Sequence, residues 1–498
     1  MASLLRRCPN IDLAYLRWYL RERWENFEPT SRQKQAAGMA VLIAIGLVLG
    51  ATVGVLGVGG AVLAVSGLAA IFVMRDFRVG VAMLVLLMPI SQSYVFPHEM
   101  FGLTGLNPLN LLVVATLVAL YMRWLGDGML KGFIPRSLFL FYIAPLIMGA
   151  CIGMFHWDEI PGIFHDLDLL SVTSEATYWR DMFMKPLMFV VYALLMACAV
   201  QKSERPERFL TPMIVSIVVM AVLAIAFVLF EGYSLSQLAG VYSRQMFSSL
   251  GMHANDLGRL YATAYAPLLF MWGRTSNSGL KLVLVIVMGL VAAALLLTFS
   301  RGAFLSFILV NIVFLISRRS TKMFALAAIL IPIAVAMAPG ALWDRVTMGV
   351  GEGADAVTAG RTGEIWGPLM PELLDSPFWG RGIGAVMWSK AMLEGRLPPV
   401  SHPHNAFLQA YLDMGIIGLL LLIAFWIYIW ARCLRYGRDP RLPENLQGFF
   451  QGSAAAIVAF LVAGFAGSSL EPDPAQVFMW LAVGMMYGLA KRLSIKIS

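Results

Sequence analysis

Charged side chains are scarce in this sequence. Lysine, arginine, aspartate and glutamate supply 13% of its 498 residues, whereas hydrophobic residues supply 59%. Soluble domains carry about 25% charged and roughly 45–50% apolar residues, so the composition excludes a soluble protein and indicates an integral membrane protein. At about 20 residues for each span, the chain has room for about a dozen or more helices in one large all-α domain.

Cysteine is rare as well. The four cysteines, Cys8, Cys151, Cys198 and Cys433, lie far apart in no C-x-x-C or Cys/His pattern, which argues against a disulfide framework and a zinc site. Nothing in the first 35 residues resembles a cleavable signal peptide, because they are charged and aromatic and lack an apolar core. We therefore expect the first span itself to direct insertion into the membrane.

Apolar stretches separated by charged or Pro/Gly-rich breaks predict a polytopic protein with about 14 membrane helices, within a range of about 12–14. The stretches are 36–54, 55–74, 79–93, 107–124, 137–154, 181–200, 210–230, 257–273, 280–298, 302–317, 322–338, 406–430, 449–467 and 475–490.

The distribution of cations predicts the topology. The net charge is +8, but Lys and Arg flank apolar segments and form no single basic face, so we expect no nucleic-acid partner. Most of the 37 Lys and Arg residues fall on one side if both termini are cytoplasmic. This topology gives a cytoplasmic amphipathic helix at 1–35, membrane helices 1–11 at 36–338, a periplasmic cap at 339–405, and at 406–498 membrane helices 12–14 with a short cytoplasmic tail.

The predicted cap is too long for a passive connection and contains helix-like, Trp-rich stretches, so we expect it to fold over the membrane face. A second outer segment, at about 155–180, is rich in Asp, His and Trp. We expect it to pack beside the cap.

Arginines on the outer side point to function. Lys and Arg should be rare there, so an excess of them suggests an anionic partner. The outer or boundary arginines are Arg244, Arg259, Arg301, Arg345, Arg361, Arg381 and Arg396.

Arg301 interrupts two apolar runs, with Gly302 after it to let the chain turn. Its guanidinium could either extend to lipid phosphates or grip the phosphate oxygens of a substrate. Arg361, inside the predicted cap, could bind a substrate or form a salt bridge with Glu364 or another acid of the loop. Asn255, at the start of a span, could bind substrate or simply cap the helix.

Two further motifs favour structural roles. The glycines of WGRGIG, residues 379–384, follow no predicted strand, so they indicate a tight turn and no nucleotide site. The acids of EPDPAQ, residues 471–476, could position a substrate, but the sequence favours a solvated turn.

The stretch SHPHN, residues 401–405, holds two of the chain's six histidines immediately before an apolar run. A neutral His404 could accept a proton from a hydroxyl near pH 7, although a histidine with no role beyond the loop is the simpler alternative. Asn405 could cap the following helix. A base combined with several outer arginines suggests transfer from a phosphate-linked donor, with arginines in place of a metal ion.

The order of these motifs resembles the bacterial O-antigen ligase and polysaccharide polymerase superfamily over residues 240–430. The motifs are FSSLGMHANDLGRL, TFSRGAFLSF, GRTGEIW, DSPFWGRGIG and HPHNAFLQAYLDMGIIG.

This resemblance implies a GT-C-like, inverting glycosyltransferase in the bacterial inner membrane that requires no metal or cofactor. The implied donor is a glycan on undecaprenyl diphosphate, presented on the periplasmic side, and the acceptor is a lipid-linked glycan or lipid A-core. A flippase and a chain-length regulator are the implied partners. By resemblance, His404 would activate the acceptor, and Arg301 and Arg361 would bind the diphosphate. The further substrate-binding candidates are Arg244, Asn255, Arg259, His402 and Asn405.

The chain departs from the family in its extra spans, its basic N-terminal helix and its doubled histidine. The first two features favour a polymerase over a ligase, and the third leaves the role of His402 open. A transporter is the alternative of another class, but transporters place ionisable residues near the bilayer midplane and show internal repeats. The predicted spans here are almost free of charge and show no repeat.

Overall fold

The computed structural model describes residues 65–100, 103–127, 133–167, 170–240, 247–467 and 469–495. The chain divides into two units, residues 1–69 and 70–498, and the architecture below is that of the second. The predicted amphipathic helix at 1–35 and the predicted span at 36–54 lie outside the described residues. In the described part the only strands are β1 (Glu99–Met100) and β2 (Leu103–Thr104), which pair antiparallel.

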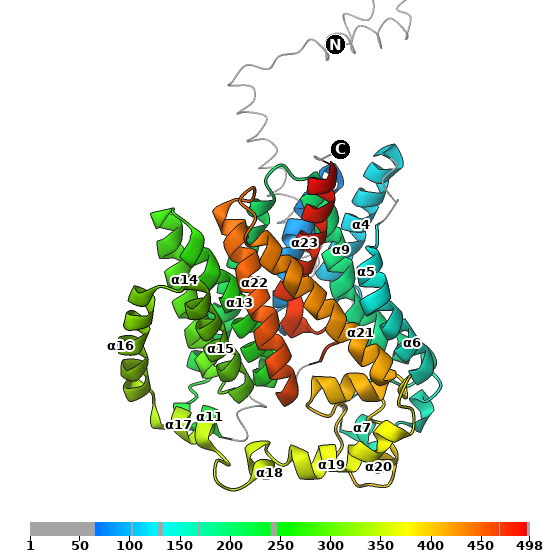
Figure 1. The fold of residues 1–498 in the computed structure, drawn as a ribbon. Helices are drawn as coiled ribbons and strands as arrows, with labels where there is room; N and C mark the ends of the chain where they lie inside the picture. Colours follow the sequence, from blue (N-terminus) through cyan, green and yellow to red (C-terminus); the bar gives the residue numbers. More distant parts are fainter. Residues whose placement is uncertain are drawn as a thin grey trace, which may run out of the picture. The chain divides into compact units, whose positions relative to one another are not determined.

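Long helices make up most of the described chain (Figure 1). Every stretch predicted as a span from residue 79 onward coincides with helix. An apolar helix at Val65–Arg75 comes first. A π-helical turn joins the short helix α5 (Arg136–Leu138) to α6 (Ala144–Gly153). The other long helices are α3 (Phe77–Ile90), α4 (Pro108–Asp127), α9 (Lys185–Lys202), α10 (Leu210–Phe230), α13 (Ala254–Arg274), α14 (Ser278–Leu297), α15 (Arg301–Arg318), α16 (Thr321–Met337), α21 (Ala406–Tyr436), α22 (Glu444–Ala463) and α23 (Val477–Ile495).

Among the described residues, 8 helical segments are long and apolar enough to cross a membrane. This confirms a polytopic α-helical membrane protein, whereas the predicted number of about 14 spans and their orientation stay predictions. The helix α13 is not among the 8, although it has 21 residues. Its first turns carry Asn255, Asp256 and Arg259, which lower its hydropathy, and Asn255 and Arg259 line a cavity at the end of the bundle.

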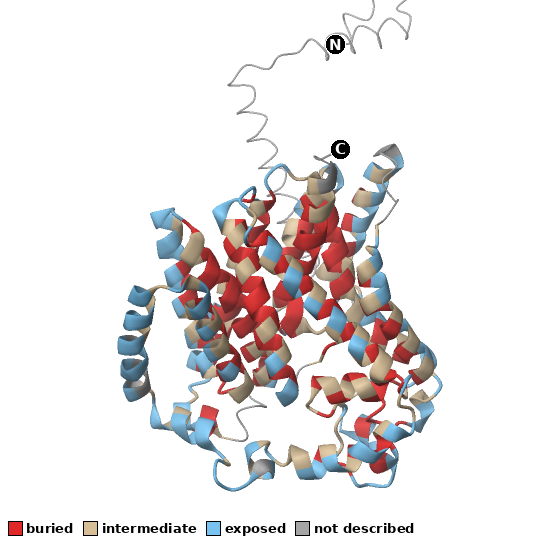
Figure 2. Ribbon diagram, in the orientation of Figure 1, coloured by how far each residue is buried: buried red, intermediate tan, exposed pale blue. Residues whose placement is uncertain are grey.

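The core of the bundle is formed by α13, α22, α23 and α9 (Figures 1 and 2). Glycines allow these helices to approach closely. A Cβ atom at Gly452 of α22 would lie 2.4 Å from Cα of Pro267 in α13, and one at Gly484 of α23 would lie 2.5 Å from the carbonyl oxygen of Ala193 in α9. By contrast, most of the described side chains of α16 are exposed (Figure 2), as expected of a helix that faces lipid.

Short helices gather at one end of the bundle, opposite the end at which α23 finishes (Figure 1). They include α7 (Ile163–Asp166), α11 (Leu235–Ala239), α17 (Gly340–Thr347), α18 (Ala354–Val357), α19 (Gly367–Leu369) and α20 (Lys390–Leu393), while α8 (Glu175–Tyr178) leads into α9. We call residues 339–405 the cap segment.

The cap segment has a hydrophobic core of its own that includes the second outer segment. Phe164 and Tyr178 of that segment are buried in one cluster with Ile365, Leu369 and Trp388 of the cap segment. The hydroxyl of Tyr178 also donates to the carbonyl oxygen of Ile383, 2.8 Å away. The prediction that residues 155–180 pack beside the cap segment is confirmed.

The glycine turn of WGRGIG docks the cap segment onto the bundle. Gly382 has φ +94°, and a Cβ there would lie 2.2 Å from Cα of Gly153 in α6. Its N–H donates to the carbonyl oxygen of Asp413 at 2.9 Å, just before the break in α21 at Gly415, where φ is +65° and ψ is −174°. The turn predicted from the sequence is confirmed, and its reason is close backbone contact with two helices.

Candidate functional site

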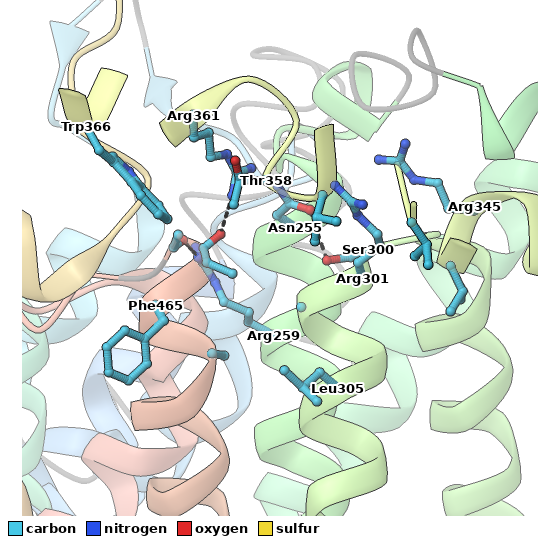
Figure 3. Close-up of a pocket in the computed structure, with 17 residues that line it drawn as sticks. Asn255, Arg259, Ser300, Arg301, Leu305, Arg345, Thr358, Arg361, Trp366 and Phe465 are labelled. Atoms are coloured by element: carbon cyan, nitrogen blue, oxygen red, sulfur yellow. Dashed lines mark hydrogen bonds between the residues drawn. The ribbon is translucent and has the colours of Figure 1, made fainter. Parts of the chain in front are cut away.

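A cavity of about 300 Å³ lies where the cap segment meets the bundle (Figure 3). Its wall comes from the first turns of α13 and α15, from the cap segment, and from the end of α22 with the turn that follows. Four arginines from these separate elements line it: Arg259, Arg301, Arg345 and Arg361. Arg244 lies outside the described residues.

The turn between α14 and α15 sets the position of Arg301. Phe299 has φ +46°, and Ser300 then caps α15 by accepting a hydrogen bond from the N–H of Ala303 at 3.4 Å. Helix α15 therefore begins at Arg301, and Gly302 lies inside the helix. The expectation that Gly302 makes the turn was wrong. Its bare backbone lines the cavity instead, and a Cβ there would meet nothing within 4 Å.

Asn255 does not cap its helix. The cap of α13 is His253, whose Nδ1 accepts the N–H of Asn255 at 3.2 Å. The side-chain oxygen of Asn255 accepts a hydrogen bond from the hydroxyl of Ser300, 2.9 Å away. Asn255 and Ser300 thus join the first turns of α13 and α15, and both line the cavity.

Arg301 and Arg345 connect the start of the cap segment to the bundle. Arg301 Nη1 donates to the carbonyl oxygen of Met348 at 3.0 Å. The side chain of Arg345 in α17 is buried, and its Nε donates to the carbonyl oxygen of Phe299 at 3.3 Å. Both guanidinium groups thus bring positive charge to the cavity wall where the cap segment meets the turn before α15.

Arg259 and Arg361 hold the turn after α22 from opposite directions. Arg259 donates to the carbonyl oxygen of Gly467 and forms an ion pair with Asp256. Arg361 Nη1 donates to the carbonyl oxygen of Ala466 at 2.7 Å. Among the described residues, Nε of Arg259 is a buried donor without a hydrogen-bond partner. Such a donor is costly unless a ligand or water satisfies it.

The cavity is therefore cationic, and it is also partly apolar. Trp366 and Phe465 lie on one side of it and Arg345 on the other, with Leu305 toward the membrane helices (Figure 3). Phe465 is 60% exposed and Leu305 is 48% exposed. Guanidinium groups beside apolar side chains suit a phosphate-bearing molecule with an apolar portion.

The SHPHN turn lies against the same wall. Trp366, which lines the cavity, donates from Nε1 to the carbonyl oxygen of Pro403 at 2.8 Å. His404 is not itself a lining residue, but it lies next to Gly467, where a Cβ would be 3.7 Å from Cα of His404. Asn405 caps α21 by accepting from the N–H groups of Phe407 at 3.1 Å and Leu408 at 3.2 Å, which confirms the capping prediction.

His402 occupies a different environment from that of an ordinary loop histidine. Its pKa is lowered to about 4, mainly by burial and also by the nearby positive charges of Arg259 and Arg361, against the opposing effect of Asp473. The imidazole of His402 is therefore neutral at physiological pH.

The EPDPAQ turn is less solvated than the sequence suggests. The carboxyl group of Glu471 lies beside that of Asp413 in α21, and its Oε1 atom is buried. Burial, with the adjacent charge of Asp413, raises the pKa of Glu471 well above its ordinary value. Burial likewise raises the pKa of Asp473, which lies near Arg259. The expectation of a solvated turn was wrong because both acids face the protein interior.

Most of the other residues that line the cavity were not predicted from the sequence. Arg345 stood out as an outer arginine but with no assigned role, and Trp366, Ser300 and Phe465 were not singled out. Trp366 lies in the motif GRTGEIW and Ser300 in the motif TFSRGAFLSF, so membership of these motifs could have identified both residues. The described residues contain no group of three or more His, Cys, Asp or Glu placed to hold a metal ion.

Comparison with known families identifies part of the chain. Residues 284–423 match the sequence model for O-antigen ligase. We call this stretch the O-antigen ligase domain, after the family that its sequence matches. The match confirms the resemblance drawn from the motifs over these residues. Independently, the apolar helices of the described residues make the chain a multi-pass membrane protein. No curated protein matches the chain.

The O-antigen ligase domain supplies only part of the cavity wall. It contains Arg301, Arg345, Arg361 and the SHPHN turn, whereas Arg259 and the turn after α22 lie outside it. Hydrogen bonds from Arg259 and Arg361 to consecutive carbonyl groups join the two parts. The candidate site is thus completed by helices on both sides of the domain.

Proposed function

We propose that this protein is a membrane glycosyltransferase that uses an oligosaccharide linked to undecaprenyl diphosphate as its donor. The observation that carries the proposal is the convergence of four arginines on one cavity beside His404. A lipid-linked diphosphate has the matching chemistry, with phosphate oxygens for the guanidinium groups and an isoprenoid chain for the apolar wall. The proposed location is the inner membrane, with the cavity facing the periplasm.

The proposed reaction proceeds in one displacement. The arginines hold the diphosphate, and a ring nitrogen of His404 takes the proton of an acceptor hydroxyl. The acceptor oxygen then forms a bond to the anomeric carbon from the face opposite the diphosphate. The bond from that carbon to the phosphate oxygen breaks, and its electron pair leaves with the diphosphate. The anomeric configuration inverts.

Charge stabilisation and positioning are the main requirements of this reaction, since a diphosphate is already a good leaving group. Arg301 and Arg361, the arginines carried over from the family, are proposed to bear the developing negative charge. Arg259 offers a buried donor at the same cavity, and Arg345 is added to the proposal because it lines the wall. Together they supply the positive charge for which other glycosyltransferases use a divalent ion.

Within this class we favour a polymerase, which lengthens a lipid-linked glycan of a surface polysaccharide, over a ligase that transfers the glycan to lipid A-core or to a protein. A flippase that delivers the donor and a chain-length regulator are the proposed partners of a polymerase. The acceptor distinguishes the two activities.

The test uses the purified protein and an undecaprenyl-diphosphate-linked repeat unit as the sole substrate. A polymerase produces longer lipid-linked chains, which a gel resolves, whereas a ligase yields product only after lipid A-core is added. His404→Ala and Arg301→Ala are expected to abolish either product while the protein remains in the membrane. Normal product from His404→Ala would contradict the assignment of His404 as the base. The absence of product with either acceptor would contradict the proposed function.

A further inference from the structure

The doubled histidine of the SHPHN turn is a structural pair. The ring centroids of His402 and His404 are 4.2 Å apart, with an angle of 72° between the ring planes. The backbone N–H of His404 donates to Nδ1 of His402 at 3.3 Å. The side chain of residue i thus accepts the N–H of residue i+2, as Asn and Asp side chains do in Asx turns.

The hydrogen bond supports a backbone conformation that His404 would not adopt readily. His404 has φ +52°, in the left-handed region that non-glycine residues rarely occupy and that persists only where the surroundings enforce it. On one side the bond to His402 holds the turn. On the other, Trp366 Nε1 donates to the carbonyl oxygen of Pro403, and Asn405 caps α21. The backbone conformation decides where the side chain of His404 lies relative to the wall at Gly467.

Only the neutral form of His402 can accept this bond, because a protonated imidazole has donors on both nitrogens. Its surroundings keep it neutral. Its pKa is lowered to about 4 by burial, the largest cause, together with the charges of Arg259, Arg361 and His253, while the acid Asp473 acts in the opposite sense. Nδ1 is thereby the acceptor, and the ring proton resides on Nε2.

We propose that His402 is a positioning residue for His404, and that its neutral imidazole fixes the left-handed turn which places His404 beside the arginine-lined cavity. This assignment rests on the proposed function, since it takes His404 as the base. It gives His402 a structural role, so His402 itself neither accepts the hydroxyl proton nor binds the diphosphate.

Three substitutions at one position test the assignment. Asn at position 402 keeps a side-chain acceptor for the N–H of residue 404, whereas His402→Ala and His402→Leu remove it. We expect kcat to fall on the order of tenfold to a hundredfold in the Ala and Leu variants, the loss typical of a misplaced reacting group. In His402→Asn we expect kcat to stay close to wild type, with the same dependence on pH, and we expect KM for the donor to be similar in all three variants.

Two results would overturn the proposal. If His402→Asn is as inactive as His402→Ala, the imidazole itself takes part in the chemistry or in binding. If all three variants are as active as wild type, the hydrogen bond does not matter. His404→Ala, assayed in parallel, separates these results from a failure of the proposed function. Activity in that variant would show that His404 is not the base, whatever the variants at position 402 show.

A second measurement does not depend on activity. Protein labelled with ¹⁵N-histidine carries six imidazoles, whose nitrogen shifts report protonation and tautomer in an NMR titration. We expect one imidazole to stay neutral down to about pH 5, with its proton on Nε2, and its signal to vanish in His402→Asn. Ordinary titration of all six imidazoles would contradict the proposal even if no substrate is found.

Discussion

The guanidinium group of Arg361 donates a hydrogen bond to the carbonyl oxygen of Ala466, 2.7 Å away. Arg361 belongs to the cap segment, and Ala466 ends the turn of helix that follows α22. The two residues are 105 positions apart in the chain. Their contact closes one wall of the cavity and places a cation of the O-antigen ligase domain against a segment outside that domain.

This contact predicts that position 361 requires the geometry of arginine. In Arg361→Lys the charge is kept, but the compact ammonium group lacks the planar fork with which a guanidinium can bond the Ala466 carbonyl and a phosphate bidentately. We expect transfer to fall roughly tenfold or more in Arg361→Lys, and further in Arg361→Ala. Initial rates of glycan transfer at several donor concentrations measure the effect.

Arg396 provides the matched control for that experiment. It is also in the cap segment, is 46% exposed and pairs with Glu394 at 2.7 Å, away from the cavity. Exposed pairs of this kind contribute about 0–1 kcal/mol to stability, so Arg396→Ala should be as active as wild type. An equal loss of activity in Arg396→Ala and Arg361→Ala would mean that overall charge, and not the cavity, determines the rate.

The second prediction concerns metal ions. Because the proposed site stabilises the leaving diphosphate with guanidinium groups, we expect transfer to continue at the wild-type rate after treatment with EDTA. The assay follows product formation with and without EDTA, and then after Mg²⁺ is added back. A rate that disappears with EDTA and returns with Mg²⁺ would contradict the arginine-based mechanism.

The third prediction follows from the buried carboxyl group of Glu471. Its pKa is raised well above the ordinary value of 4.5 by burial and by the adjacent Asp413, so the folded state binds this proton more tightly than the unfolded chain does. Stability should therefore fall as the pH rises from about 4.5 through the raised pKa of the folded state. Thermal unfolding in detergent across this pH range measures the change in stability.

Glu471→Gln tests the assignment of that pH dependence. The amide has the size of the protonated acid and cannot lose the proton, so the variant should retain its stability at high pH and show a flatter pH profile than wild type. A profile that falls as steeply in the variant as in wild type would assign the pH dependence to other groups.

The fourth prediction concerns the docking of the cap segment. Gly382→Ala would place a Cβ atom 2.2 Å from Cα of Gly153 at a φ of +94°, so the turn must move away from α6. We expect a loss of about 1–3 kcal/mol in unfolding free energy, the usual cost of overpacking, together with reduced activity. Thermal unfolding and transfer assays on the same sample measure both.

Gly395→Ala separates crowding from backbone conformation. Gly395 also has a positive φ, +70°, but a Cβ there would meet nothing within 4 Å. Its substitution should lower the unfolding free energy only by the strain of a left-handed backbone conformation, about 1–2 kcal/mol, and leave activity unchanged. Equal effects of the two substitutions on activity would show that the contact with α6 does not position the site.

The sequence predicts local features well where one segment determines them. Asn405 caps α21 because a helix cap depends on a few neighbouring residues. Predictions failed where a distant segment competes for the same group. Asn255 could have capped its helix, but the hydroxyl of Ser300, 45 residues away, bonds its side chain while His253 takes the cap.

The sequence by itself determined that the chain crosses a membrane many times, and its ordered motifs pointed to the O-antigen ligase family. Composition, hydrophobic length and local motifs require no knowledge of contacts. Only the tertiary structure decided that Arg259, Arg301, Arg345 and Arg361 share one cavity, and that His402 holds the backbone of His404. Those facts depend on how α13, α15, α22 and the cap segment pack, and packing between segments a hundred residues apart has no signature in local sequence.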